Sequence, residues 1–247
     1  MTQDQFTDAV MEELFVRGFV CPPRAAVAIF VRTDWQRSGP LTDPAACIES
    51  LSRVPDLLSQ ATMLGFPASA SGAREEWLAI HEAAHAIVVL KAGITLRGVR
   101  YYGDGFPGET GFEETGWQTS NDEALLQSVV RISVAANIAE LMHGHEPEGG
   151  YVSQFFDERD PAEPGQYPSD VVAAWEVAKD LAIVRFGKAG IEPTILGLRA
   201  PKRAIIEQAE AEAGEIMREN VDALSRLAQE LRRGPMTGAA VRAIVGE

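Results

Sequence analysis

The stretch "WLAIHEAAHAIVVLKAG", from Trp77 to Gly93, carries two of the four histidines of this 247-residue chain. His81 and His85 are four residues apart in an otherwise apolar run, a spacing that puts both side chains on one face of an α-helix. Lys91 falls in the expected last turn and Gly93 follows it, which is the usual order at a helix C-terminus. The sequence therefore predicts a core helix that presents two imidazole rings side by side.

Glu82 stands between these histidines and completes an H-E-x-x-H pattern. Two imidazoles at this spacing can reach a single Zn2+ ion at about 2.0–2.1 Å. A carboxylate one position along the helix points beside the ion, where it can take a proton from metal-bound water and pass it to a leaving amine. The alternative is a chance register of two hydrogen-bonded core histidines, but the helix pattern around them favours a zinc site with Glu82 as the catalytic base.

A catalytic zinc site normally has three protein ligands and one water, so a third ligand is needed. Val88 and Lys91 stand where the extended H-E-x-x-H-x-x-G-x-x-H pattern has its glycine and its third histidine, which excludes that pattern. Spacing alone leaves four candidates further along the chain, namely Glu140, His143, His145 and Asp170.

The rest of the chain predicts a mainly α fold with a small β-sheet or hairpin. Two segments, "ITLRGVRYY" and "GETGFEE", are bounded by glycine-rich turns and are expected as strands. The run "AAVAIFV", residues 25–31, fits either a buried strand or a helical turn. Apolar periodicity predicts further helices over residues 2–19, 44–53, 55–64, 121–143, 169–187 and 201–231.

A stretch rich in Gly, Ala and Ser, residues 65–73, indicates a linker. We therefore expect an N-terminal helical region of unknown role, residues 1–70, and a second domain, residues 71–247, that contains the zinc helix. Residues 144–168 have no clear period and exceed the usual length of a simple connection. They fit a functional loop and a plain surface loop equally well.

The formal net charge of −14 argues against nucleic acid and anionic membrane surfaces as partners, because no cluster of Lys and Arg reverses it locally. The longest purely apolar run, residues 25–31, is far shorter than the roughly 20 residues that cross a bilayer. The N-terminal sequence is acidic where a secretory signal is basic, which predicts a cytoplasmic protein. Cys21 and Cys47 form no C-x-x-C pair and are expected as reduced thiols.

Four segments between about Arg74 and the C-terminus occur in an order that a known family shares. They are "AIHEAAHAIV", "VVRISVAANIAELMHG", "YPSDVVAAWEVAKDLAIVRFG", and "EIMRENVDALSRLAQEL" followed by "MTGAAVRAIV". Together they resemble the peptidase domain of the FtsH family of ATP-dependent zinc metalloproteases, from its H-E-A-G-H helix to its C-terminal helix and tail. The third segment is similar to the one whose aspartate is the family's third zinc ligand, and that residue falls on Asp170.

The resemblance implies a zincin-like metallopeptidase fold in which His81, His85 and Asp170 hold Zn2+ and Glu82 is the catalytic residue. Glu140 is then expected to support the site and to be the second choice as ligand. The implied activity is that of a zinc metalloendopeptidase. A catalytically silent zincin-fold module with a regulatory or protein-interaction role is the alternative, and it would share the metal ligands.

Several features depart from the family. Ala84 replaces the glycine of H-E-A-G-H, and Ala136 and Asn137 stand where the family typically has Gly-Arg. No G-x-x-x-x-G-K-[ST] motif for ATP binding occurs in these residues, and we expect none of them to form the family's membrane anchor. The sequence thus predicts hydrolysis of peptides or unfolded protein segments, unless a separate ATPase partner delivers the substrate. Family rings involve the missing ATPase part, so a monomer and a homo-oligomer are both compatible with this chain.

Overall fold

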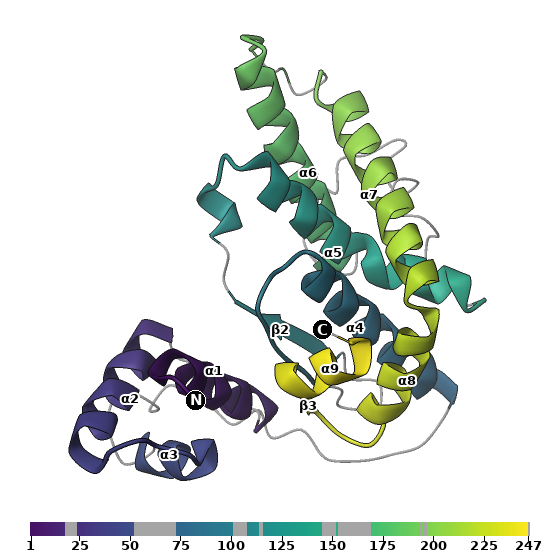
Figure 1. Cartoon of the computed structure of the whole chain (residues 1–247). Helices are drawn as coiled ribbons and strands as arrows, with labels where there is room; N and C mark the ends of the chain where they lie inside the picture. Colours follow the sequence, from purple (N-terminus) through teal and green to yellow (C-terminus); the bar gives the residue numbers. More distant parts are fainter. Residues whose placement is uncertain are drawn as a thin grey trace.

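The computed structural model describes residues 1–17, 24–51, 73–100, 108–113, 116–144, 152, 169–192, 194 and 197–246. Within these ranges the fold is mainly helical with one three-stranded antiparallel sheet, so the predicted class is confirmed at that level (Figure 1). The elements are α1 (Gln3–Val16), α2 (Arg24–Ser38), α3 (Pro44–Leu51), α4 (Ala73–Lys91), β1 (Leu96–Arg100), β2 (Glu109–Phe112), η1 (Trp117–Thr119), α5 (Glu123–Met142), α6 (Ser169–Lys188), α7 (Arg199–Glu219), α8 (Val221–Leu231), β3 (Met236–Thr237) and α9 (Gly238–Val245).

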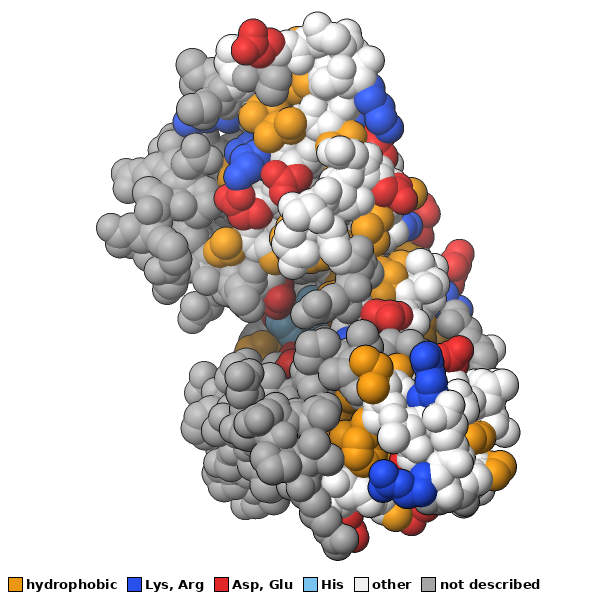
Figure 2. All heavy atoms as spheres, turned by 90° about the vertical axis from the view of Figure 1, so that its left-hand side faces the viewer, with side chains coloured by type: hydrophobic (Ala, Val, Ile, Leu, Met, Phe, Trp, Pro, Cys, Tyr) orange, Lys and Arg blue, Asp and Glu red, His pale blue; other side chains and the backbone are white. Residues whose placement is uncertain are grey.

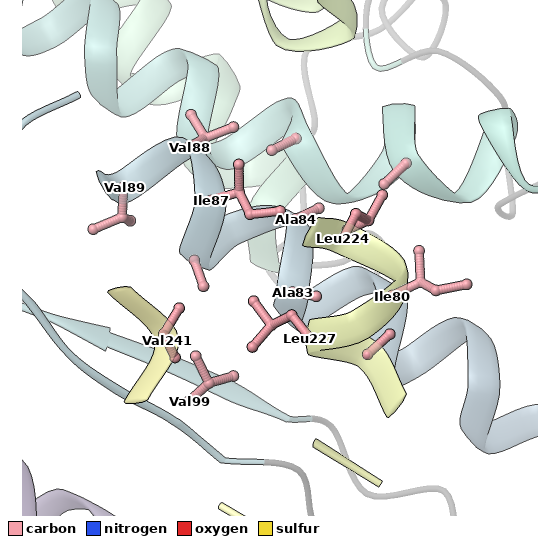
Figure 3. Packing of buried hydrophobic residues seen from close by; sticks show 14 of the residues in the cluster. Ile80, Ala83, Ala84, Ile87, Val88, Val89, Val99, Leu224, Leu227 and Val241 are labelled. Atoms are coloured by element: carbon pink, nitrogen blue, oxygen red, sulfur yellow. The ribbon is translucent and has the colours of Figure 1, made fainter. Parts of the chain in front are cut away.

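The helix with the H-E-x-x-H pattern, α4, packs against α5, α8 and strand β1. All of residues 79–90 are buried except His81, which is partly exposed. Figure 3 shows Ala84 and Ile87 of α4 in one buried cluster with Leu227 of α8 and Val99 of β1. Ala84, at the position of the glycine in the H-E-A-G-H pattern, is therefore accommodated inside this core. Burial on several sides fixes the direction in which the histidines point.

Helices α5, α6 and α7 pack against one another around a second buried cluster, and α5 also packs against α4. Among the described helices, α5 is the one long and apolar enough to cross a membrane by length and composition. Its most apolar window is 67% buried inside the fold, and core helices pass the same test. In this fold α5 packs against both α4, which carries the H-E-x-x-H pattern, and α6, which carries Asp170 near its N-terminus.

The sheet has the strand order β2-β1-β3, and both pairings are antiparallel. The predicted strand "ITLRGVRYY" corresponds to β1, which is internal because it has a neighbour on each side. The predicted strand "GETGFEE" corresponds to β2, which lies at the edge of the sheet. Helix α1 packs against β1 and β3, as α4 does against β1.

The run "AAVAIFV" is part of helix α2, so the strand alternative is wrong. Val27 and Val31 are one turn apart and are both fully buried in a cluster with α1 and α3. Ile29, between them in sequence, is 64% exposed because it lies on the opposite side of the helix. The apolar run therefore contains one buried helical face. The exposed Ile29 hid the helical period of the apolar residues in the sequence.

The single helix predicted over residues 201–231 is wrong, because the chain breaks it at Asn220 into α7 and α8. Asn220 has φ −117°, and its side-chain amide donates a hydrogen bond of 2.8 Å to the carbonyl oxygen of Ile216. Such a local side-chain bond competes with the helical hydrogen bonds. The predicted stop of α6 at Gly187 is also wrong by one residue, and Gly190 takes the left-handed φ of +69° after the helix.

Helices α1, α2 and α3 share a buried cluster of their own. Helix α1 also contacts strands β1 and β3, which lie within residues 71–247. Most of the predicted linker, residues 65–73, and most of the predicted loop, residues 144–168, lie outside the described residues. The same holds for the helix predicted over residues 55–64 and for Cys21. The division into residues 1–70 and 71–247 therefore stays a prediction.

Candidate metal centre

His81, His85 and Asp170 come together from two helices, although Asp170 is 89 residues from His81 in the chain. The Nε2 atoms of the two histidines are 3.3 Å apart. The Asp170 Oδ2 atom lies 3.1 Å from the Nε2 of His81 and 3.4 Å from that of His85. Ligands about 2.0–2.1 Å from a tetrahedral zinc ion are about 3.3 Å from each other. The three donor atoms therefore fit one face of such a tetrahedron.

The second nitrogen of each ring, Nδ1, has a hydrogen-bond partner on the side away from this triangle. The Nδ1 atom of His85 lies 2.7 Å from the carbonyl oxygen of Ile132, and that of His81 lies 2.6 Å from Glu140 Oε1. A carbonyl oxygen accepts hydrogen bonds and does not donate, so Nδ1 of His85 carries the hydrogen. Partners of this kind fix the ring orientation and leave the Nε2 lone pair for a metal.

The four sequence candidates for a third ligand differ in where they lie. Asp170, in the first turn of α6, is brought into the histidine pair. Glu140 is 3% exposed and contacts the opposite nitrogen of His81. His143 follows α5, with its Nδ1 atom 2.8 Å from the carbonyl oxygen of Ala139. His145 lies outside the described residues. In the described part of the chain, the geometry therefore favours Asp170.

The electrostatics of the site favour a cation between these groups. Burial opposes ionisation of Asp170, but both histidines outweigh it and hold the pKa of that carboxyl well below its ordinary range. Burial disfavours the charged form of His81, yet hydrogen bonds with Asp170 and Glu140 raise its pKa to about 10. At neutral pH a bound metal must therefore displace a proton from the histidine pair, as metal binding to imidazole generally does.

Glu82 is 5% exposed, and its carboxyl group accepts a hydrogen bond from strand β2. The Thr110 hydroxyl donates to Glu82 Oε2 at 2.7 Å and lies 3.1 Å from the Glu82 carbonyl oxygen. Gly108 lies close by, and a Cβ atom there would be 2.3 Å from Cγ of Glu82. Burial raises the pKa of Glu82, while both histidines and Thr110 oppose the shift. The carboxyl group is therefore fixed in position and retains protons more readily than an exposed glutamate.

Sequence reasoning missed Thr110 and Gly108, which lie in the segment expected only as a strand. The available signal was the alternation of side chains along β2. It places Thr110 on the same face of the strand as Phe112. The partner of His85, the carbonyl oxygen of Ile132, had no signal, since every residue has such an oxygen.

A cavity of about 320 Å³ adjoins the candidate metal ligands. Its polar side is formed by His81, His85, Asp170 and Glu82 and by strand β2, and its apolar lining comes from η1, α5 and α6. In Figure 2 a histidine is visible in a hollow between the upper and lower parts of the molecule, beside an acidic side chain. The residues of this apolar lining are Trp117, Val129, Ile132 and Ala173, and Phe112 of β2 adds to it.

We expect Glu140→Gln to weaken zinc binding by about 10–100-fold, the usual effect of altering the partner of a ligating histidine. The amide keeps the shape of the side chain but removes the negative charge 2.6 Å from His81 Nδ1. Zinc affinity is measured by competition with a chromophoric chelator. Glu176→Gln, an exposed change on α6, is the control and should leave the affinity unchanged. Equal affinities of Glu140→Gln and wild type would contradict this role of Glu140.

Known proteins add no family to these observations. No protein-family model matches the chain, and a comparison with curated proteins gives no match. The resemblance to the FtsH peptidase domain therefore stays a prediction from four sequence segments, and a function has to be inferred from the geometry of the site.

Proposed function

We propose that this chain is a zinc metalloendopeptidase with a zincin-like fold similar to the FtsH peptidase domain. The observation that carries the proposal is the triangle of His81 Nε2, His85 Nε2 and Asp170 Oδ2, with edges of 3.1 to 3.4 Å. The carboxyl group of Glu82 lines the same cavity. Two neutral imidazoles and one carboxylate suit zinc, and they leave a fourth position for water or substrate.

The chain's own residues supply the remaining chemistry. When bound, zinc provides Lewis acidity to a scissile carbonyl and lowers the pKa of water to about 7. Glu82 takes a proton from the attacking water and passes it to the leaving amine. Thr110 donates to one oxygen of Glu82, which fixes the direction of the other oxygen. The raised pKa of Glu82 suits a group that must both accept and release a proton near neutral pH.

An extended peptide backbone is the substrate that best fits the cavity. Strand β2 lines it, and within the described residues β2 pairs with β1 alone. An extended chain can add to such an edge through backbone hydrogen bonds, which do not depend on its sequence. Because β1 is internal, strand addition to β1 is ruled out and β2 takes that role. Trp117 and Val129, which line the same cavity, favour apolar side chains near the scissile bond.

Peptides and unfolded protein segments are therefore the proposed substrate class. An extended backbone is available in such substrates without any work of unfolding. A folded substrate would first have to be unfolded, and a separate ATPase partner is the proposed source of that work. Substrate entry from solution agrees with the hollow in which the histidine is visible in Figure 2.

The test is hydrolysis of casein by the purified, zinc-loaded chain in the absence of ATP. We expect cleavage that stops when 1,10-phenanthroline removes the metal and returns when zinc is added back. Metal content is measured on the same samples, so that activity is compared at known occupancy. Fully zinc-loaded protein that leaves casein and short unfolded peptides intact would contradict the proposal and would favour the silent interaction module.

A further inference from the structure

Phe15, at the end of helix α1, packs directly against a pair of glycines in the sheet. The side chain of Phe15 is buried, and Gly98 of β1 and Gly111 of β2 are cross-strand partners beneath it. A Cβ atom at Gly98 would lie 2.9 Å from Phe15 Cδ1, and one at Gly111 would lie 2.3 Å from Phe15 Cε2. A larger residue at either position would clash with the ring, and at Gly98 also with the carbonyl oxygen of Met236, 2.6 Å from such a Cβ. The ring therefore contacts the backbone of β2 directly.

The contact with Phe15 is on the opposite face of β2 from Glu82. Successive residues of a strand point to opposite faces, so Thr110 and Gly111 face different sides of the sheet. Thr110 donates to Glu82 of α4 on one side, and Gly111 lies under Phe15 of α1 on the other. Strand β2 is thus held between the N-terminal helix and the proposed catalytic glutamate.

Arg100 extends this contact towards the start of β2. Its guanidinium carbon lies 3.9 Å from the centroid of the Phe15 ring, in cation–π geometry. Its Nη2 atom lies 2.5 Å from Glu109 Oε2, and Glu109 is the residue before Thr110. The Arg100 side chain is only 5% exposed, and its contacts with Phe15 and Glu109 are among those that take the place of water around this charge. Glu109 and Gly111 flank Thr110. Gly111 contacts Phe15 directly, and Glu109 is linked to it through Arg100.

Strand β2 needs such support because it has four residues and lies at an edge. Short edge strands have few ladder hydrogen bonds and open easily. We infer that Phe15 is a positioning residue, which holds β2 so that the Thr110 hydroxyl keeps Glu82 in its reactive orientation. The N-terminal helix α1 is then part of the catalytic unit. This inference rests on the proposed function of Glu82.

The positions of the proposed metal ligands allow the role of Phe15 to be distinguished from general damage to the site. His81 and His85 lie on α4, Asp170 lies on α6, and the groups that orient the histidines lie on α5. Neither α1 nor β2 supplies any of these groups. A change at Phe15 should therefore alter turnover and leave zinc affinity unchanged.

The experiment compares Phe15→Leu with Phe6→Leu in the zinc-loaded full chain. Phe6 lies on the same helix and is also fully buried, but it packs against Trp35 of α2 and belongs to the cluster of α1–α3. We expect Phe15→Leu to lower kcat for a fluorogenic peptide by about 10–100-fold, as expected for a misplaced catalytic group. Phe6→Leu should leave kcat unchanged, and both variants should bind zinc as the wild type does.

A double-variant cycle with Thr110→Val tests whether Phe15 acts through Thr110. When the hydroxyl is already absent, Phe15→Leu should cause no further loss of kcat, because both changes remove the same support of Glu82. Losses that multiply in the double variant would overturn the inference, because Phe15 would then act by another route.

Amide hydrogen exchange gives a second readout that does not need catalysis. Exchange at the β2 amides that hydrogen-bond to β1 should be at least about tenfold faster in Phe15→Leu than in wild type, and unchanged in Phe6→Leu. Unchanged exchange in Phe15→Leu would overturn the positioning role whatever the activity. A zinc-loaded wild type without activity would instead overturn the proposed function, while faster exchange would still establish that Phe15 supports β2.

Discussion

Replacing Glu82 with glutamine is expected to lower kcat for casein and for unfolded peptides by about 10²–10⁴-fold, with zinc still bound. This is the usual range for loss of a general base. The glutamine side chain has nearly the same shape and can still accept the hydrogen bond from Thr110, which lies 2.7 Å from Oε2. It cannot take a proton from water. Zinc should remain, because Glu82 is not one of the three groups whose donor atoms form the triangle.

The measurement pairs turnover with metal content for wild type, Glu82→Gln and the control Glu76→Gln. Glu76 is exposed and lies on the same helix, so its amide variant tests the loss of one charge on α4 alone. The control should keep wild-type turnover. Wild-type turnover in Glu82→Gln would show that another group is the base. Loss of zinc from Glu82→Gln would show that Glu82 is a ligand, and the assigned roles would then be wrong.

The sequence was most informative where the site is local. His81, Glu82 and His85 occupy one turn of helix, so their relative positions follow from the helical repeat alone. Two strands of the small sheet were also predictable, because "ITLRGVRYY" and "GETGFEE" have turn residues on both sides, whereas the two-residue strand β3 was not predicted. Asp170 was different. It is 89 residues from His81, and its position depends on how α5 packs between α4 and α6. Spacing left it among four candidates.

The supporting groups could not be predicted for physical reasons. The Ile132 carbonyl that binds His85 is a backbone atom, and the helix gives no sequence signal for which carbonyl is used. The contact of Phe15 with Gly98 and Gly111 joins the first helix to a sheet that starts some 80 residues later, so no local pattern records it. Such groups become visible only when the elements are packed together.

Replacing Asp170 with asparagine is expected to weaken zinc binding by more than the about 10–100-fold expected for Glu140→Gln. A neutral amide oxygen is a poor zinc ligand, and the change also leaves the two histidines without the carboxylate that faces both of them. Zinc stabilises a folded protein by about 2.7 kcal/mol when its concentration is 100 times Kd. The rise in Tm on adding zinc should therefore be large in wild type and nearly absent in Asp170→Asn at the same zinc concentration.

Asp180→Asn is the matched control for this change, because Asp180 lies on the same helix and is absent from the group that could hold a metal. It should keep both the zinc affinity and the zinc-dependent rise in Tm. Retention of wild-type affinity by Asp170→Asn would exclude Asp170 as the third ligand. Glu140 would then be the remaining carboxylate among the four sequence candidates, but its oxygen lies against Nδ1 of His81, 2.6 Å away, and not beside the two Nε2 atoms. One ion could bind Glu140 together with both histidines only if these side chains moved from their positions, so the observed arrangement favours Asp170 over Glu140.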